Sequence, residues 1–309
     1  MRLVTRSDFD SIVSAALLRE LGIVDDIFFT HQKDLQDGKV TVTKNDILVN
    51  VPYVEGCGLW LDHHSSEGER LNLQGRFKGC SKPAPSAARV VYEYYNCSGK
   101  PSKFNKMMKI DEIMENVDKA DSANFTKDEI LNPEDWVLLS FICDPRTGLD
   151  YYHGYRISHM QLMTELIEYL RTKSVAEIMK LPDIKERVDR YFENDKNHKE
   201  FMQKHSIIDG TIVITDLRGV ADMPPGNRHI VYALYPDSNI SIRLTDGMEK
   251  QYVVFSVGYS VLNRTSKVDV GSLMLKYGGG GHKAVGTCRI SYGDADRVLN
   301  EMVEMIKCI

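Results

Sequence analysis

The sequence lacks the features that mark secreted, membrane-spanning or nucleic-acid-coating proteins. Its six cysteines include no Cys-x-x-Cys pair, which argues against a disulfide framework and against a zinc ribbon. No apolar run reaches membrane-spanning length and the N-terminus has no apolar signal-like segment, so we expect a cytoplasmic protein with no membrane association. The net charge of −5 and the pI of about 6.0 lack the basic excess that binding of long nucleic acid requires. Short oligonucleotides and other small phosphates remain as ligands.

Internal repeats and low-complexity tracts are also missing, and 309 residues with 42% hydrophobic content suffice for two domains with their own cores. Strand-like runs alternate with helical segments in the first half of the chain, which predicts an α/β domain with a doubly wound parallel sheet. The predicted strands are 2–5, 26–30, 46–51 and 58–61, and the predicted helices are 11–21, 86–97, 104–120, 133–143, 155–172 and 183–205.

From about residue 206 the pattern changes to short β-rich runs followed by two helices, which predicts a smaller α+β domain. The β-rich runs are 211–215, 229–235, 239–244, 251–257 and 286–291, and the helices are 270–277 and 293–307. We therefore expect a first domain over 1–195, a helical linker over 196–209 and a second domain over 210–309.

The run Leu61-Asp62-His63-His64 closes an apolar segment and places metal-binding side chains at the end of a predicted strand. Histidine and carboxylate together suit a borderline divalent ion such as manganese or zinc. Two hydrogen-bonded core histidines are the alternative. We disfavour it because neighbouring strand residues point to opposite faces, so both would need buried partners.

Asp8 and Asp10 follow the first predicted strand and precede the helix predicted over 11–21. In open α/β sheets, ligands gather at the carboxyl ends of the strands, so this acidic pair predicts a strand-end site. The alternative is that both carboxylates only cap the helix, as carboxylates commonly do.

Four consecutive glycines, Gly278 to Gly281, precede His282. Consecutive glycines expose backbone N–H groups that can approach a phosphate without hindrance from side chains. The alternative is that the glycines only let a helix turn sharply into a strand. One or two glycines would suffice for such a turn, so the run followed by histidine favours anion binding.

In this order, these motifs resemble those of the DHH superfamily of phosphoesterases followed by its DHH-associated C-terminal domain. Asp8 and Asp10 match the first motif, and Asp62-His63-His64 matches the third. Asp121 matches the fourth, with Asp118 one helical turn earlier as an alternative. The resemblance implies an active site in the cleft between the two domains, where a metal-activated water hydrolyses a phosphate ester or anhydride.

The resemblance also implies a role for each matching residue. The expected ligands of Mn²⁺ or Mg²⁺ are Asp8, Asp10, His63 and Asp121. We expect His64 to face the phosphate as a catalytic residue and Asp62 to orient a histidine. The expected substrate-binding groups in the second domain are Arg264, Gly279, Gly280, Gly281 and His282.

Two positions depart from the family pattern. Arg6 stands where relatives usually have a histidine ligand, and Asn50 stands where they have an aspartate. Arginine stays protonated and cannot bind a metal, and asparagine is a poorer ligand than a carboxylate. The two changes make the pocket more positive by two units, the charge of one divalent ion. Our hypothesis is that the Arg6 guanidinium has replaced one of two metals in phosphate binding and catalysis, leaving one tightly bound ion per chain.

These inferences predict a metal-dependent phosphodiesterase or phosphatase that acts on a small phosphorylated substrate. Short oligonucleotides, linear or cyclic dinucleotides, 3′-phosphoadenosine phosphate and, for an exopolyphosphatase, polyphosphate stay open as substrates. A non-catalytic phosphate-binding protein is the alternative, and retention of so many functional groups disfavours it. The oligomeric state is also open, with a homodimer as one option.

Overall fold

The computed structural model describes residues 1–64, 77–96 and 103–309, and the chain divides into two compact units. The first comprises Met1–Asn124 and Pro133–Tyr191, and the second comprises Phe125–Asn132 and Phe192–Ile309. The long helix α10 (Pro182–Lys204) contains both the boundary between the units and the boundary predicted at residue 195. Among the described residues, no helix combines the length and apolarity needed to cross a bilayer.

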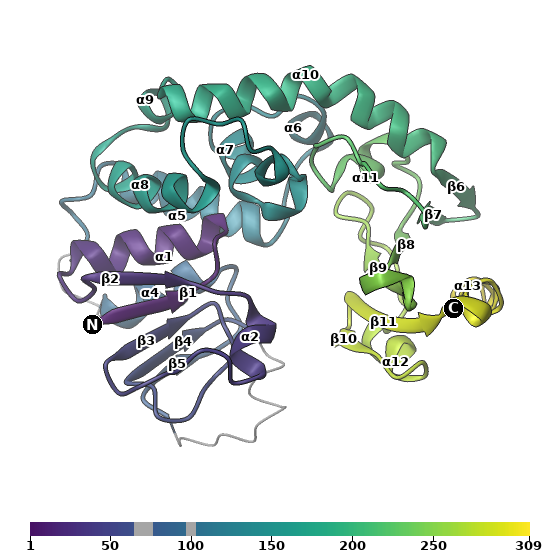
Figure 1. Cartoon of the computed structure of the whole chain (residues 1–309), viewed down its shortest axis with the longest axis horizontal. Helices are drawn as coiled ribbons and strands as arrows, with labels where there is room; N and C mark the ends of the chain where they lie inside the picture. The colour runs from purple at the N-terminus through teal and green to yellow at the C-terminus, as the bar shows by residue number, and fades with distance from the viewer. Residues whose placement is uncertain (65–76, 97–102) are drawn as a thin grey trace. The chain divides into compact units, whose positions relative to one another are not determined.

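The first unit is built on a five-stranded sheet in which all strands are parallel, and this confirms the predicted sheet (Figure 1). In spatial order the strands are β2 (Asp26–Phe29), β1 (Arg2–Thr5), β3 (Asp46–Val49), β4 (Leu59–Asp62) and β5 (Gly79–Ser81). The strands β3 and β4 are buried along their whole length, as expected of central parallel strands with both faces covered. The short strand β5 has no apolar run and was not predicted.

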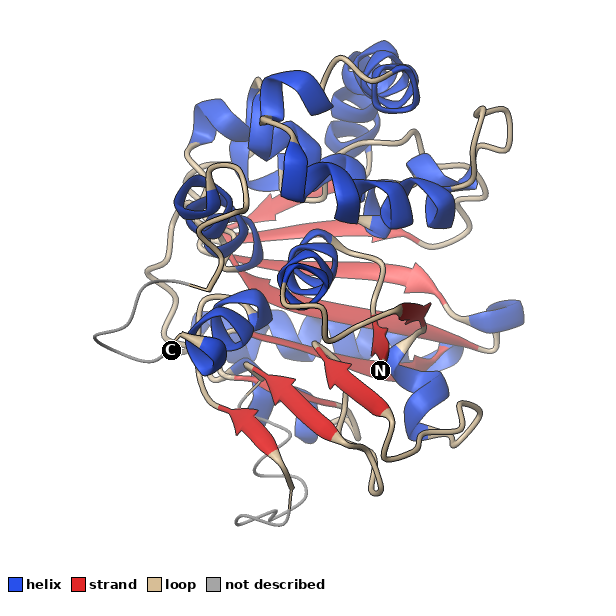
Figure 2. Cartoon of the chain, turned by 90° about the vertical axis from the view of Figure 1, so that its left-hand side faces the viewer, coloured by secondary structure: helices blue, strands red, loops and turns tan. Residues whose placement is uncertain are grey.

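Helices cover the sheet of the first unit (Figures 1 and 2). The central helix α1 (Phe9–Glu20) packs against three helices, namely α4 (Ala87–Tyr95), α5 (Ile110–Asp121) and α8 (His159–Thr172). A separate apolar cluster joins the buried Trp60 to Leu35 of α2 (Gln32–Gln36). The remaining elements of the unit are α7 (Asp135–Cys143), η1 (Pro145–Thr147), η2 (Leu149–Tyr151) and α9 (Val175–Ile178).

The second unit contains a six-stranded mixed sheet, which confirms the predicted α+β class. In spatial order the strands are β10 (Gly280–His282), β11 (Val285–Ser291), β9 (Tyr252–Tyr259), β8 (Ile240–Asp246), β7 (Ile212–Leu217) and β6 (Ser206–Asp209). The β7–β8 pair is parallel and the other pairs are antiparallel. The remaining elements of the unit are α6 (Lys127–Leu131), α11 (Ile230–Leu234), η3 (Met248–Lys250), α12 (Val270–Leu275), η4 (Tyr292–Asp294) and α13 (Ala295–Lys307).

One predicted element of the second unit was wrong. The sequence pattern predicts a β-rich run over 229–235, but Ile230–Leu234 forms the helix α11. Its residues Ile230 to Ala233 are all buried, and a short apolar run buried on every side does not distinguish a strand from a helix. In the segment predicted as a helical linker, residues 206–209 form β6, which pairs with β7.

Candidate functional site

The strands β1 and β4 place functional side chains at one edge of the parallel sheet. Both strands flank β3, so their carboxyl ends lie at the same edge. Asp8 is the N-cap of α1, three residues after the end of β1, and its carboxylate accepts a hydrogen bond from the Ser11 N–H at 3.1 Å. Asp62 is the last residue of β4, and His63 and His64 follow it.

Asp10 lies in the first turn of α1 and is only 2% exposed. Its two carboxylate oxygens accept hydrogen bonds from the first turn of α4, at 2.9 Å from the Ala87 N–H and 2.7 Å from the Ala88 N–H. Burial, together with repulsion from Asp121 and Asp8, nevertheless raises the pKa of Asp10 well above its usual range. A nearby cation would therefore stabilise the ionised carboxylate.

His63 directs one ring nitrogen, Nε2, toward two carboxylates. Its Nδ1 lies 3.1 Å from the Ala84 carbonyl oxygen, which can only accept, so Nδ1 carries the proton. In a neutral imidazole this leaves a lone pair on Nε2, which is buried and has no hydrogen-bond partner among the described residues. Nε2 lies 3.3 Å from Asp121 Oδ2 and 4.0 Å from Asp10 Oδ2. A lone pair facing two carboxylates fits a divalent cation, and the Nδ1 hydrogen bond orients the ring as in metal-binding histidines.

In the described part of the chain, Asp10, His63 and Asp121 form a group with metal-ligand spacing. One ligand atom of each residue lies within 4.8 Å of those of the other two. Asp121 is the last residue of α5. Burial of its carboxylate raises its pKa, His63 lowers it, and Asp8 raises it further, with a net upward shift.

Asp118, the alternative ligand, has other partners. One carboxylate oxygen accepts from Ser86 Oγ at 2.6 Å, and the other accepts from Arg89 Nε and Nη2 at 2.8 and 2.5 Å. Asp118 thus attaches α5 to the first turn of α4, the same turn that binds Asp10. These contacts leave Asp118 outside the group formed by Asp10, His63 and Asp121, and the choice of Asp121 as the ligand stays a prediction.

His64 is held by a buried carboxylate. Asp62 is 0% exposed, and its Oδ1 lies 2.9 Å from His64 Nδ1, while its Oδ2 accepts from the His64 backbone N–H at 3.3 Å. Burial lowers the pKa of His64, but the hydrogen bond and the charge of Asp62 outweigh this effect and leave it raised. The histidine that Asp62 contacts is therefore His64, and the orienting role of Asp62 stays a prediction.

Arg6 and Asn50, the two departures from the family pattern, both contact Asp8. Arg6 Nε lies 3.2 Å from Asp8 Oδ2, and Asn50 Nδ2 donates to Asp8 Oδ1 at 3.3 Å and to Ser11 Oγ at 3.1 Å. Asn50 has a φ of 58°, a left-handed conformation that asparagine tolerates. Asp8 is outside the group formed by Asp10, His63 and Asp121, so its role as a metal ligand stays a prediction.

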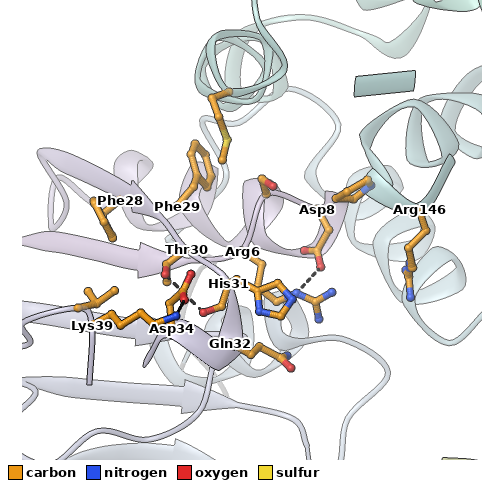
Figure 3. A pocket seen from close by; sticks show the side chains of 14 residues that line it. Arg6, Asp8, Phe28, Phe29, Thr30, His31, Gln32, Asp34, Lys39 and Arg146 are labelled. Carbon is orange, nitrogen blue, oxygen red and sulfur yellow. Dashed lines mark hydrogen bonds and ion pairs between the residues drawn. The ribbon is translucent and has the colours of Figure 1, made fainter. Parts of the chain in front are cut away.

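A residue that the sequence analysis did not single out, Arg146, lines a pocket together with Arg6 and Asp8 (Figure 3). Its guanidinium binds Asp144 through Nε at 2.7 Å and Nη2 at 2.9 Å. Burial lowers the pKa of Arg146, while Asp144, Asp8 and Asp121 raise it to a net upward shift. Asp144-Pro145-Arg146 lies at the turn after α7, outside the motifs that predict the site, and the arginine itself is the signal that the sequence offers.

In the second unit, Arg264, Gly279 and Gly281, which are among the predicted phosphate-binding residues, lie close to neighbouring backbone atoms. Arg264 Nε donates to the Val261 carbonyl at 3.1 Å. A Cβ on Gly279 would lie 2.1 Å from the Thr287 carbonyl oxygen, and one on Gly281 would lie 2.3 Å from the Gly286 Cα. These two glycines are therefore required for the pairing of β10 with β11, whereas a Cβ on Gly280 would meet nothing within 4 Å. Phosphate binding by Arg264, the glycines and His282 stays a prediction.

A parallel sheet whose strand ends carry an acidic pair and an Asp-His-His run is the arrangement expected of DHH phosphoesterases. No family model and no curated protein matches the chain. Among solved structures, the chain is similar to PggH, a pGpG-specific phosphodiesterase from Vibrio cholerae, with 45% identity, a TM-score of 0.80 and 99% of each chain covered. The DHH domain of a protein assigned to a ribosomal protein family has the same fold, at 12% identity and a TM-score of 0.56, with 99% of this chain and 86% of that chain covered. The chain belongs to the DHH superfamily of phosphoesterases and is a hydrolase.

Proposed function

We propose that the protein is a metal-dependent phosphodiesterase that hydrolyses pGpG or a closely similar linear dinucleotide to two mononucleotides. The observation that carries this proposal is the 45% identity to a pGpG-specific phosphodiesterase over 99% of both chains. In the reaction, a water oxygen bonds to the bridging phosphorus and the bond from phosphorus to the leaving 3′ oxygen breaks. The leaving oxygen takes up a proton, and the water loses one.

Asp10, His63 and Asp121 would hold one divalent ion, Mn²⁺ or Mg²⁺. When bound, such an ion lowers the pKa of water and neutralises charge on the phosphoryl oxygens. The unpartnered Nε2 of His63 and the raised pKa of Asp10 support this assignment, because a cation would satisfy both groups. One ion is proposed in place of two because Arg6 and Asn50 already bind the carboxylate of Asp8.

Arg6, Arg146 and His64 would contact the phosphate. Asp62 raises the pKa of His64 and so increases the fraction of imidazolium, the form that donates through both ring nitrogens. Arg6 and Arg146 supply guanidinium groups that suit phosphate oxygens. In the second unit, Arg264, His282 and the Gly279–Gly281 backbone are proposed to bind the rest of the substrate.

The test is a hydrolysis assay with pGpG, a cyclic dinucleotide, 3′-phosphoadenosine phosphate and polyphosphate, with Mn²⁺ or with a chelator. We expect GMP from pGpG with Mn²⁺ and none with the chelator. The variant His63→Ala should be inactive, and His153→Ala, a control at an exposed histidine, should be fully active. Hydrolysis of polyphosphate but not of pGpG would instead identify an exopolyphosphatase. Binding of pGpG without hydrolysis would identify a non-catalytic binding protein.

A further inference from the structure

A pocket of about 650 Å³ extends from Arg6 and Asp8 along the carboxyl end of β2 in the first unit (Figure 3). It adjoins the proposed metal site, because Asp8 lines it and is the N-cap of α1, the helix whose first turn contains Asp10. The proposed hydrolysis uses Arg6, Asp8 and Arg146 but leaves the other lining residues without a role. These other lining residues include Phe28, Phe29, His31, Asp34, Lys39 and Met160.

Part of the lining is apolar and aromatic. Phe28 is 41% exposed although it is a large aromatic residue on a strand, and Met160 is 46% exposed. Phe29, the last residue of β2, lines the same pocket. Aromatic side chains that remain accessible beside a phosphate site are the groups on which nucleobases stack. This part of the pocket therefore suits the face of a base.

The polar lining suits the edge of guanine. Asp34 is 41% exposed, and its Oδ1 accepts from Lys39 Nζ at 2.8 Å. A carboxylate can accept hydrogen bonds from guanine N1–H and N2–H together. Adenine presents an unprotonated N1 at that edge, which would face the negative charge. Asp34 therefore favours guanine over adenine.

His31 supplies the complementary donor. Its Nδ1 lies 3.1 Å from the Lys33 backbone N–H, which can only donate, so Nδ1 is the acceptor. In the neutral ring the proton is then on Nε2, where it can be donated to a carbonyl oxygen or ring nitrogen such as guanine O6 or N7.

We propose that this pocket binds one guanine base of the dinucleotide, with Phe28 against the face of the base and Asp34 reading its N1–H and N2–H groups. The proposal rests on the proposed function and adds to it the residues that select the base. It places base selection in the first unit, at the end of β2 and the start of α2.

The experiment measures kcat/KM for the four dinucleotides pGpG, pGpA, pApG and pApA. The unmodified protein should prefer guanine at one position at least. The variant Asp34→Asn should reduce the guanine-over-adenine ratio at that position by roughly 5- to 150-fold, the range of one bidentate base contact. The matched control is Asp37→Asn. Asp37 pairs with Lys33 at 2.6 Å and Lys39 at 3.7 Å but does not line the pocket, so its loss should leave the ratio unchanged.

A second variant, Phe28→Leu, keeps an apolar side chain and removes the aromatic face. Because stacking tolerates any base, this change should raise KM for guanine and adenine substrates by the same factor. The pocket assignment would be overturned if Asp34→Asn kept the guanine-over-adenine ratio of the unmodified protein. It would also be overturned if Asp34→Asn and Asp37→Asn reduced this ratio equally. Failure of the unmodified protein to cleave any dinucleotide would instead refute the proposed function, which separates the two failures.

Discussion

Replacement of Asp118 by asparagine separates a positioning carboxylate from a metal ligand. The change removes the charge that binds Arg89 and keeps the size of the side chain. Asp118 and Arg89 are 17% and 25% exposed, so their ion pair lies between an exposed pair, worth about 0.2–1 kcal/mol, and a buried pair, whose rupture costs about 3–5 kcal/mol. The amide oxygen can still accept one hydrogen bond. We therefore expect the free energy of unfolding to fall by about 1–2 kcal/mol.

For a unit of this size, such a loss lowers the melting temperature by roughly 2–8 °C. Thermal melting followed by circular dichroism, without added metal, measures it. Titration calorimetry with Mn²⁺ should give an affinity close to that of the unmodified protein, because Asp118 is already bound by Ser86 and Arg89.

The matched variant Asp121→Asn should behave in the opposite way. In the unmodified protein, the folded-state pKa of Asp121 is raised above 3.8, so its ionised carboxylate destabilises the metal-free protein. This loss of stability is absent below pH 3.8 and complete once the pH exceeds the folded-state pKa. At neutral pH the amide removes this penalty, so the melting temperature should rise or stay constant while Mn²⁺ affinity falls. Loss of Mn²⁺ binding in Asp118→Asn, with unchanged melting and intact binding in Asp121→Asn, would exchange the two roles and refute the reasoning.

Three further predictions concern the metal and the second unit. His63→Ala should lose Mn²⁺ by elemental analysis yet keep its circular dichroism spectrum, because it removes a ligand and little core volume; unchanged metal content would remove His63 from the site. His282→Ala should raise KM or lower kcat without changing bound Mn²⁺, and metal loss in this variant would make His282 a ligand instead. The unmodified protein should bind about one Mn²⁺ per chain, and the double variant Arg6→His with Asn50→Asp should gain a second, weaker site. Two tightly bound ions in the unmodified protein would contradict the single-ion model.

The central strands could be predicted from the sequence because they are buried on both faces and read as continuous apolar runs. The strands β3 and β4 are of this kind. The same rule failed at 229–235, where an equally apolar run forms α11. Local pattern alone does not reveal what surrounds a short apolar segment, and β5, with only Gly79, Cys80 and Ser81, has no pattern to detect.

Some residues of the candidate site could be predicted from the sequence, and others could not. Asp10 and His63 follow strands that end at one edge of the sheet, so their proximity could be expected from strand order. The pairing of Asp118 with Arg89 depends on the packing of α5 against α4, and the place of Arg146 depends on how the turn after α7 approaches β1. These are tertiary contacts between segments far apart in sequence, and no local spacing encodes them.

The proposal of a single divalent ion rests on the charges of the site. When all are ionised, Asp8, Asp10 and Asp121 carry three negative charges, and their mutual repulsion contributes to the raised pKa values of Asp10 and Asp121. Arg6 neutralises Asp8, and one divalent ion would neutralise the other two carboxylates. A second divalent ion would leave the same site with two excess positive charges and no free oxygen on Asp8. An aspartate at position 50 alone would pair with Arg6. A second ion therefore requires both Arg6→His and Asn50→Asp, because only the two changes together restore the metal ligands and the negative charge.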